Sequence, residues 1–360
     1  MAAPDHSGEH TRDYWFDLPP ERIADRPAAR RDAARLMHLP LDGGAPTHHA
    51  FADLPTLLSP GDLLVLNDTR VFPARIGATK PDTGGRIELL LVEPLEGGAW
   101  KAMVKGRLRP GTAIRLDGGL DGTALDDLGD GFWRCRFGGD AATHLEAHGA
   151  LPLPPYIKRP PDRADRDTYQ TVFARETGSV AAPTSGLHFT PELFRALAER
   201  GIRHAFVTLH VGPGTFLPVR AERLDDHVMH AERYHVPADT VAAIARARAA
   251  GGRVIACGTT VTRTLESAAG ADGAVAAGAG SSVLFIRPGY RFQVVDGLIT
   301  NFHLPGSTLL MLVAALAGRG RVLAAYAEAV AAGYRFFSYG DAMLLDRAGP
   351  ARPPLSGERA

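Results

Sequence analysis

The pattern of apolar residues changes near residue 150, and this change limits the folds that the chain can adopt. Between residues 61 and 139 the apolar runs are short, and glycine-rich breaks separate them. Short runs between glycine turns are typical of small antiparallel barrels. The next segment, Leu151–Pro161, carries five prolines in eleven residues, which favours a stiff, extended connector.

Beyond the connector, strand-like and helix-like segments alternate. Thr190 is a suitable N-cap for a helix that ends at Gly201, and the apolar run Ile202–Val211 follows as a strand. Further helices are expected after Gly258 and after Ser307, while the alanine-rich residues 268–280 are expected to form a surface loop. This alternation predicts an α/β domain with a partly parallel sheet.

The charge and the cysteine content exclude several classes of protein. The 40 basic and 40 acidic residues cancel, which argues against non-specific coating of nucleic acid but allows a local basic patch. No apolar run is long enough to span a bilayer and no export signal is visible, so we expect a cytoplasmic protein without a membrane partner. Cys135 and Cys257 match no zinc or redox spacing and are expected to be free thiols. The candidate patch residues are Lys105, Arg107, Arg109, Lys158, Arg159, Arg163 and Arg166.

Five later segments are rich in Gly, Thr, Ser, His and aromatic residues where an apolar run ends. Glycines let a backbone approach a ligand, and hydroxyls and imidazoles supply directional hydrogen bonds. Ligands of open α/β sheets bind at the carboxyl ends of strands, so the five segments predict one pocket built from several loops. They are Ala181–Pro191, Val207–Arg220, Gly258–Glu266, Thr300–Leu310 and Tyr334–Asp341.

Three histidines in these segments, His188, His210 and His303, are the candidate catalytic residues. A histidine near its ordinary pKa can act as a general base at neutral pH, although a buried structural role is the alternative for each. A separate cluster, residues 225–232, contains His227 and His230 in a D-D-H-x-x-H-x-E pattern. We favour contact with RNA or substrate for this pair over a metal site, because no cysteine accompanies it.

Other polar residues also allow two interpretations. The turn at Gly258, Thr259 and Thr260 could cradle an anion or a ribose, since backbone N–H groups and a helix dipole would face it. Arg263 and Glu266 could be a simple ion pair one helical turn apart, or Glu266 could hold a ribose hydroxyl or an amine. Phe336, Phe337 and Tyr339 could stack on a base, or they could belong to the core. Asn67–Arg70 could contact the substrate, or it could form an Asx turn stabilised by its own side chains.

The same motifs resemble those of the S-adenosylmethionine:tRNA ribosyltransferase-isomerase family. The resemblance also covers Tyr14–Pro27, Leu66–Arg75 and Leu151–Arg159, and so extends over most of the chain. It implies a large mixed α/β domain, residues 1–61 and 151–360, into which a small antiparallel β-barrel domain, residues 62–150, is inserted.

The resemblance also implies an activity. The ribosyl moiety of S-adenosylmethionine is transferred to 7-aminomethyl-7-deazaguanine at the tRNA wobble position and isomerised, giving epoxyqueuosine and releasing adenine and methionine. The implied partner is a tRNA with a GUN-type anticodon, and the implied protein is a monomer that needs no metal. S-adenosylmethionine is then consumed as the ribosyl donor.

The motifs select two sets of binding residues. The residues expected to contact S-adenosylmethionine are Thr184, Gly186, Gly212, Gly214, Gly258, Thr259, Thr260, Arg263 and Glu266. The residues expected to contact the substrate base or the tRNA are Asp68, Arg70, Arg75, Lys158, Arg159, His227, His230, Asn301, Phe336 and Tyr339.

Some positions depart from the family pattern, and two other functions compete. Asp25 stands where Gln is expected, Ser185 and Pro213 where Ala is common, and Gly306 where Lys is common. An S-adenosylmethionine-dependent RNA methyltransferase would carry an early G-x-G-x-x-G run, which the sequence lacks. A non-catalytic RNA-binding barrel protein would not need the polar segments of the α/β part.

Overall fold

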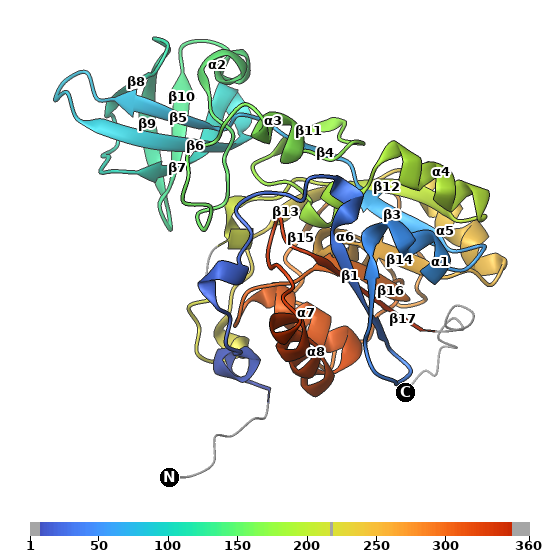
Figure 1. The fold of residues 1–360 in the computed structure, drawn as a ribbon. Helices are drawn as coiled ribbons and strands as arrows, with labels where there is room; N and C mark the ends of the chain where they lie inside the picture. Colours follow the sequence, from blue (N-terminus) through green and yellow to red (C-terminus); the bar gives the residue numbers. More distant parts are fainter. Residues whose placement is uncertain (1–7, 217–218, 348–360) are drawn as a thin grey trace.

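The computed structural model describes residues 8–216 and 219–347. The chain forms a nine-stranded mixed sheet, a closed six-stranded barrel, and a two-stranded sheet that lies between them (Figure 1). This arrangement confirms the predicted fold class, a mixed α/β domain with an inserted antiparallel barrel.

The larger sheet brings the polar segments to one edge. Its neighbouring strands β12, β3, β14 and β16 are mutually parallel, so their carboxyl ends point the same way. His210, Asp68, Gly258 and His303 follow these ends closely along the chain. In spatial order the strands are β15 (Gly278–Ser282), β13 (Glu232–Val236), β12 (Arg203–Leu209), β3 (Leu63–Asn67), β14 (Val254–Cys257), β16 (Gly297–Asn301), β17 (Ala342–Asp346), β1 (Arg35–Pro40) and β2 (Thr47–Ala50).

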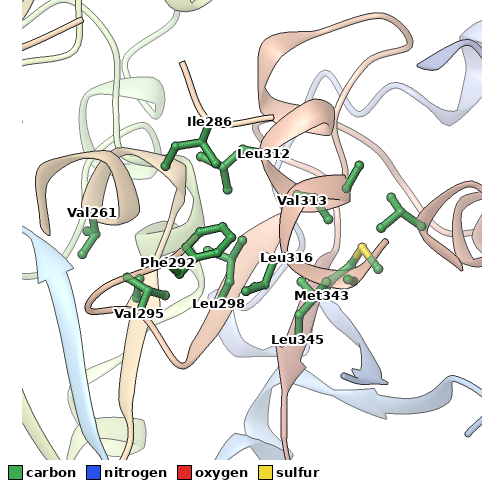
Figure 2. Packing of buried hydrophobic residues seen from close by; sticks show 14 of the residues in the cluster. Val261, Ile286, Phe292, Val295, Leu298, Leu312, Val313, Leu316, Met343 and Leu345 are labelled. Carbon is green, nitrogen blue, oxygen red and sulfur yellow. The ribbon is translucent and has the colours of Figure 1, made fainter. Parts of the chain in front are cut away.

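Helices cover both faces of this sheet because its strands are apolar on both sides. In β3, Leu63 and Val65 pack into one core and Leu64 and Leu66 into the opposite one, as the two-residue repeat of a strand requires. Figure 2 shows part of the first core, with Val261 and Leu312 among its labelled residues. The first core also takes residues from α5 (Ala238–Ala249), α6 (Thr259–Ser267), α7 (Thr308–Ala317) and α8 (Arg319–Ala331), and the second from α1 (Leu54–Leu57) and α4 (Pro191–Glu199).

The helix starts follow the capping residues of the sequence. The Oγ1 atom of Thr190 accepts a hydrogen bond from the Leu193 amide at 3.1 Å, and Ser307 caps α7 in the same way at 3.2 Å. Both caps confirm the prediction. Helix α6 begins directly after Gly258, which has a φ of 98°, so Thr259 and Thr260 belong to its first turn.

The barrel is entirely antiparallel and closes through β9 and β10. Its interior is filled by alternate apolar residues of the strands, and Leu145 of α2 (Ala141–His148) packs against them. Cys135 lies in this interior and Cys257 in β14, and both are free thiols as predicted. Around the barrel the strands are β10 (Phe132–Phe137), β7 (Ala99–Lys105), β6 (Arg86–Pro94), β5 (Arg75–Thr79), β8 (Ala113–Leu116) and β9 (Asp121–Gly129).

Two short parallel strands connect the barrel with the rest of the molecule. The chain leaves through β4 (Thr69–Val71) and returns through β11 (Glu176–Ser179), after α3 (Asp165–Thr168). Figure 1 shows both strands between the barrel and the larger sheet. In β11, Gly178 interrupts the register between Thr177 and Ser179.

Two runs differ from the sequence expectation. Residues 63–66, expected among the barrel strands, form most of β3 at the centre of the larger sheet, because this run is apolar at every position and a barrel strand must leave one face to solvent. The domain limits 62 and 150 themselves remain predictions. The end of the alanine-rich segment forms β15, not a loop. Its Gly280 lies so close to Tyr234 of β13 that an added Cβ atom would be 2.5 Å from the ring.

Within residues 8–216 and 219–347, no single helix combines the length and apolarity needed to cross a membrane. Helices α7 and α8 would reach those limits only as a pair, and a bend of 115° separates them.

Candidate active site

Two adjoining cavities lie at the edge of the larger sheet where the polar segments meet. The larger one, about 650 Å³, is a cleft between the barrel and the α/β part, since its lining includes Lys101 and Phe132 of the barrel and His210 of the α/β part. The smaller one, about 50 Å³, lies at the start of α6 and beside the end of β16. Val211, Thr215 and Leu309 line both cavities, so the two are neighbours.

Of the three candidate catalytic histidines, His210 is the one that lines the large cleft. Its Nδ1 atom lies 2.9 Å from the Oγ1 atom of Thr69, and its Nε2 atom makes no hydrogen bond with any described residue. The ring also rests on the backbone of Gly178, where an added Cβ atom would lie 2.7 Å from Cε1. Burial, and after it the charge of Arg233, lowers the pKa of His210 below its ordinary value. A neutral ring with a free nitrogen on a cleft can accept a proton at neutral pH.

His303 lines the small cavity and is neutral. Its Nε2 atom lies 2.8 Å from the Oγ1 atom of Thr300, and burial lowers the pKa of His303 to about 3. A ring with so low a pKa cannot act as a protonated acid near pH 7. Its contribution to the cavity is therefore that of a neutral hydrogen-bonding group.

His188 lines neither cavity. Its ring packs against Phe51, with centroids 4.8 Å apart, and its Nε2 atom lies 3.3 Å from the Oδ1 atom of Asn301. Asn301 in turn donates hydrogen bonds to the carbonyls of Phe337 and Ser338, which sets the direction of its side-chain oxygen. Burial lowers the pKa of His188 to about 4. His188 therefore positions Asn301, and it is Asn301 that lines the small cavity.

A buried ion pair holds the loop between the two cavities. Arg263 of α6 contacts the Oε2 atom of Glu232, and the Oε1 atom of Glu232 accepts hydrogen bonds from the Gly212 amide and the Thr215 hydroxyl at 3.2 and 3.3 Å. The loop Gly212–Thr215, which includes Gly214, lines the large cleft. Arg263, expected to contact S-adenosylmethionine, lines the large cleft too, but its guanidinium is committed to Glu232 and to the carbonyls of Ser282 and Leu284.

His227 and His230 both line the large cleft, and their contact with RNA or substrate remains a prediction. His230 faces Phe132 of the barrel with centroids 6.3 Å apart, and the ring of His227 lies edge-on to Phe285 at 5.2 Å. Within the described residues, no group of three or more histidine, cysteine or carboxylate side chains is arranged to hold a metal ion.

The small cavity collects most of the hydroxyl- and glycine-rich residues expected to contact S-adenosylmethionine, but not all. Thr184, Gly258, Thr259 and Thr260 line it together with Ser185. Gly186 instead packs beneath them, since an added Cβ atom would lie 2.8 Å from Phe173.

Glu266 lines neither cavity. Its carboxylate accepts hydrogen bonds from the amides of Gln293, Val294 and Val295, at 2.8 to 3.0 Å, and one from the Tyr290 hydroxyl. It therefore fixes the loop before β16, and these bonds leave it turned away from a ribose in either cavity.

The segment after β3 is largely structural. The Asn67 side chain accepts from the Thr69 and Leu209 amides, which is the Asx-type alternative. Asp68 is buried and binds Arg175 at 2.7 Å and the Thr208 hydroxyl at 2.7 Å. Arg70 is exposed on β4, and Arg75 donates to the Leu153 carbonyl at 3.2 Å. Asp68, Arg70 and Arg75 line neither cavity.

Lys158 and Arg159 have different surroundings. Lys158 is exposed, whereas Arg159 forms a two-point ion pair with the buried Asp165 at 2.6 and 2.7 Å. Arg159 also donates to the Asp25 carbonyl at 3.1 Å. Because that contact uses the backbone of Asp25, it does not depend on which side chain stands there.

Phe336 and Tyr339 are buried, which removes the surface that base stacking requires. Phe336 packs against Phe302 and Tyr326, and the Tyr339 hydroxyl donates to Asp165 at 3.1 Å. The core alternative is therefore correct for both residues. Phe337, between them, lines the small cavity and has a φ of 75°.

Several residues of the site escaped the sequence analysis. Thr69, Glu232 and Ser185 were not selected as ligands or partners, and neither were Lys101 and Phe132 of the barrel. Glu232 stands in the D-D-H-x-x-H-x-E pattern, two positions after His230, and this pattern pointed to a metal site instead. The barrel residues gave no signal, since only the folded chain places them on the cleft.

The chain was compared with known proteins. A family described as queuosine biosynthesis protein matches residues 11–345. A relative from Anaeromyxobacter dehalogenans (strain 2CP-1) is named S-adenosylmethionine:tRNA ribosyltransferase-isomerase and is 57% identical over an alignment of 343 residues, which covers 93% of this chain and 99% of the relative. A relative of the same name from Geobacter sulfurreducens is 54% identical over an alignment of 340 residues. This alignment covers 92% of this chain and 98% of the relative.

A solved structure agrees with these relatives. It is the crystal structure of an S-adenosylmethionine tRNA ribosyltransferase from Thermotoga maritima, whose sequence is 38% identical. The match covers 92% of this chain and 99% of that chain, with a TM-score of 0.53. The family match covers both the barrel and the nine-stranded sheet. The chain therefore belongs to the queuosine biosynthesis protein family.

Proposed function

We propose that this chain is an S-adenosylmethionine:tRNA ribosyltransferase-isomerase of queuosine biosynthesis. The observation that carries the proposal is the Nε2 atom of His210, which no described residue hydrogen-bonds, on a cleft between the barrel and the α/β part and beside a cavity lined by hydroxyls. The relatives that bear this name are 51% to 57% identical, and the alignments span at least 92% of the chain.

The substrates have separate places in the proposed site. The large cleft takes the wobble nucleotide of the tRNA, 7-aminomethyl-7-deazaguanine, extruded from its neighbours as modifying enzymes require. The exposed ring of His230 offers a face to a base, and the buried Phe132 supports it, with ring centroids 6.3 Å apart. Lys101, 4.8 Å above the Phe132 ring, supplies a positive charge on the same wall of the cleft. S-adenosylmethionine lies across both cavities, with the loop Gly212–Thr215 and the start of α6 around it.

His210 supplies the proton chemistry in this proposal. A sulfonium acidifies the C5′ hydrogens of the attached ribose, and the Nε2 atom of His210 accepts one of them. The C5′–H electron pair, first held on carbon as an ylide, forms a C4′=C5′ double bond as the C4′–O4′ bond breaks. The electron pair of O4′ then forms a C1′=O4′ double bond, and the bond from C1′ to the base breaks with its electron pair going to the departing adenine. The imidazolium of His210 can return its proton to that leaving group. His303 is excluded from this acid role by its pKa of about 3.

A turnover assay tests the proposal. Full-length protein is mixed with S-adenosylmethionine and an anticodon stem-loop that carries the aminomethyl-deazaguanine, and the products are analysed by mass spectrometry. Adenine and methionine in equal amounts, with an RNA enlarged by the isomerised ribosyl group, are expected. S-adenosylhomocysteine with a methylated RNA would replace the proposal by a methyltransferase, and tight RNA binding without products would replace it by a binding protein.

The finer features belong to the same proposal. We expect a cytoplasmic monomer, a tRNA with a GUN-type anticodon, and a reaction that needs no metal. Treatment of the protein with EDTA before the stem-loop assay should leave turnover unchanged, and sedimentation should report one chain per particle. Stem-loops that differ only in the first anticodon base test the anticodon preference directly.

A further inference from the structure

The small cavity at the start of α6 is lined by hydroxyls that have no partner in the described chain. Ser185 and Thr259 are 5% and 6% exposed, and neither hydroxyl makes a hydrogen bond with a described residue. The same is true of the hydroxyls of Thr184 and Thr260. Buried polar groups are nearly always paired, so the two buried hydroxyls of Ser185 and Thr259 point to a group that binds in this cavity, beside the partly buried Thr184 and Thr260.

These hydroxyls converge on the amino end of α6. A Cβ atom added to Gly258 would lie 3.5 Å from the Oγ atom of Ser185 and 3.5 Å from the Oγ1 atom of Thr260. Gly258 offers no capping side chain, and the first amides of the nine-residue helix have no partner within it. Unpaired amides and the positive end of the helix dipole favour a negative group at this point.

The size and the charge of the small cavity limit which part of a ligand can bind there. Its volume of about 50 Å³ suits a few non-hydrogen atoms, whereas a purine ring has about ten. No lysine, arginine, aspartate or glutamate lines it, so the polar groups that an anion could meet there are hydroxyls, amides and the neutral ring of His303, among apolar side chains such as Val211 and Leu309. A carboxylate fits this description in size and charge, and an ammonium group would face the wrong end of the helix.

We propose that the small cavity binds the α-carboxylate of S-adenosylmethionine, through the hydroxyls of Ser185, Thr259 and Thr260 and the first amides of α6. The inference rests on the proposed function, which supplies the ligand. Since Val211 and Thr215 line both cavities, a carboxylate held here leaves the sulfonium and the ribose in the large cleft, on the side of His210.

The test compares two ligands that differ only in this carboxylate. Binding of S-adenosylmethionine and of decarboxylated S-adenosylmethionine to the full chain is measured by titration calorimetry. We expect the natural ligand to bind about 10- to 100-fold more tightly, as loss of hydrogen bonds to a charged group requires. Thr259→Val should reduce this ratio to within about threefold by weakening the natural ligand alone.

A matched control lies on the same helix. Thr264 is buried, but its hydroxyl donates to the Thr260 carbonyl at 2.9 Å and lines neither cavity, so Thr264→Val should keep the full ratio. If Thr259→Val fails to fold, as judged by its thermal transition, Ser185→Ala removes another of the hydroxyls without adding volume and should lower the ratio too.

Several outcomes would overturn the inference. Equal affinities of the unmodified chain for the two ligands would do so, and so would equal weakening of both by Thr259→Val. If the ligands bind equally while adenine is still released in the turnover assay, the inference fails and the proposed function stands. If S-adenosylmethionine neither binds nor yields adenine, both fail.

Discussion

The imidazole of His210 and the hydroxyl of Thr69 lie 2.9 Å apart, although 141 positions separate them in the chain. The Thr69 hydroxyl also lies 3.4 Å from the Glu176 carbonyl, to which it can only donate. It then accepts from the Nδ1–H group of His210, and this tautomer leaves the lone pair of Nε2 in the cleft. Thr69 is thus a positioning residue for the proposed base.

Replacement of His210 by alanine should lower kcat by about 10²- to 10⁴-fold, the usual contribution of a general base. The affinity for S-adenosylmethionine should change far less, because the His210 ring does not line the small cavity, where the carboxylate of this ligand is proposed to bind. His204→Ala is the control, since that exposed histidine packs against Phe194 and lines neither cavity. Single-turnover rates within tenfold of the unmodified chain would show that His210 is not the base.

The pH dependence of kcat should respond in opposite directions to two charges near His210. A base must be unprotonated, so activity falls as pH drops through the pKa of His210, which burial and Arg233 hold below its ordinary value. Arg233→Met should move this acid limb to higher pH, and Glu93→Gln, which removes a charge that raises the pKa, should move it lower. Rate profiles between pH 5 and 8 measure both shifts. Movement in the same direction would rule out this charge control.

Glu232→Gln should destabilise the protein by about 3–5 kcal/mol, because it leaves the buried charge of Arg263 without its partner. The loop Gly212–Thr215 should loosen as well, which raises KM for S-adenosylmethionine. Arg287→Met is the comparison, since its pair with Asp225 is exposed and contributes at most about 1 kcal/mol. Urea unfolding provides both free energies, and similar losses for the two variants would contradict the assignment.

Two buried histidines should make the fold sensitive to acid. Burial holds the pKa of His188 at about 4 and that of His303 at about 3, whereas both are near 6.5 in the unfolded chain. The unfolded state therefore binds more protons as pH falls below about 6.5, and each histidine lowers the free energy of unfolding by roughly 1.4 kcal/mol per pH unit. Urea unfolding between pH 7.5 and 5 measures this slope. His303→Gln should lower the slope by roughly 1.4 kcal/mol per pH unit, and an unchanged slope would show that His303 titrates normally.

Charge reversal at two adjacent positions should have different effects. Lys158→Glu should weaken tRNA binding and reduce its salt dependence, since an exposed lysine near the nucleic acid displaces a counterion. Arg159→Glu should instead lower the thermal midpoint, because Arg159 neutralises the buried Asp165. Filter binding across a salt series and thermal scans separate the two. An unchanged salt slope for Lys158→Glu would assign that residue to structure alone.

Local signals in the sequence predicted those parts of the fold that depend on neighbours along the chain. The caps Thr190 and Ser307 and the strand-to-loop junctions at His210, Gly258 and His303 follow from short-range patterns. Because the parallel strands of the central sheet share one direction, these junctions had to meet at one edge.

Roles that depend on distant partners could not be predicted in the same way. The exposure of Phe336 is decided by Phe302 and Tyr326, and that of Tyr339 by its bond to Asp165, 174 residues away. Glu266 appeared free to hold a ligand because the loop 290–295 that it binds is more than 20 residues further on. Residue type at these positions allows both a ligand and a core role, and only tertiary packing separates them.

The pairing of β4 with β11 ties the position of His210 to the length of the chain on both sides of the barrel. Thr69 and Gly178, the two residues against which the His210 ring rests, belong to these two strands. A one-residue insertion in either strand would shift its register and turn alternate side chains to the opposite face. Insertions and deletions should therefore accumulate in the barrel loops during evolution, while β4 and β11 keep their lengths. If the barrel of a relative replaces that of this chain, the chimera should remain functional only when the junctions lie outside β4 and β11.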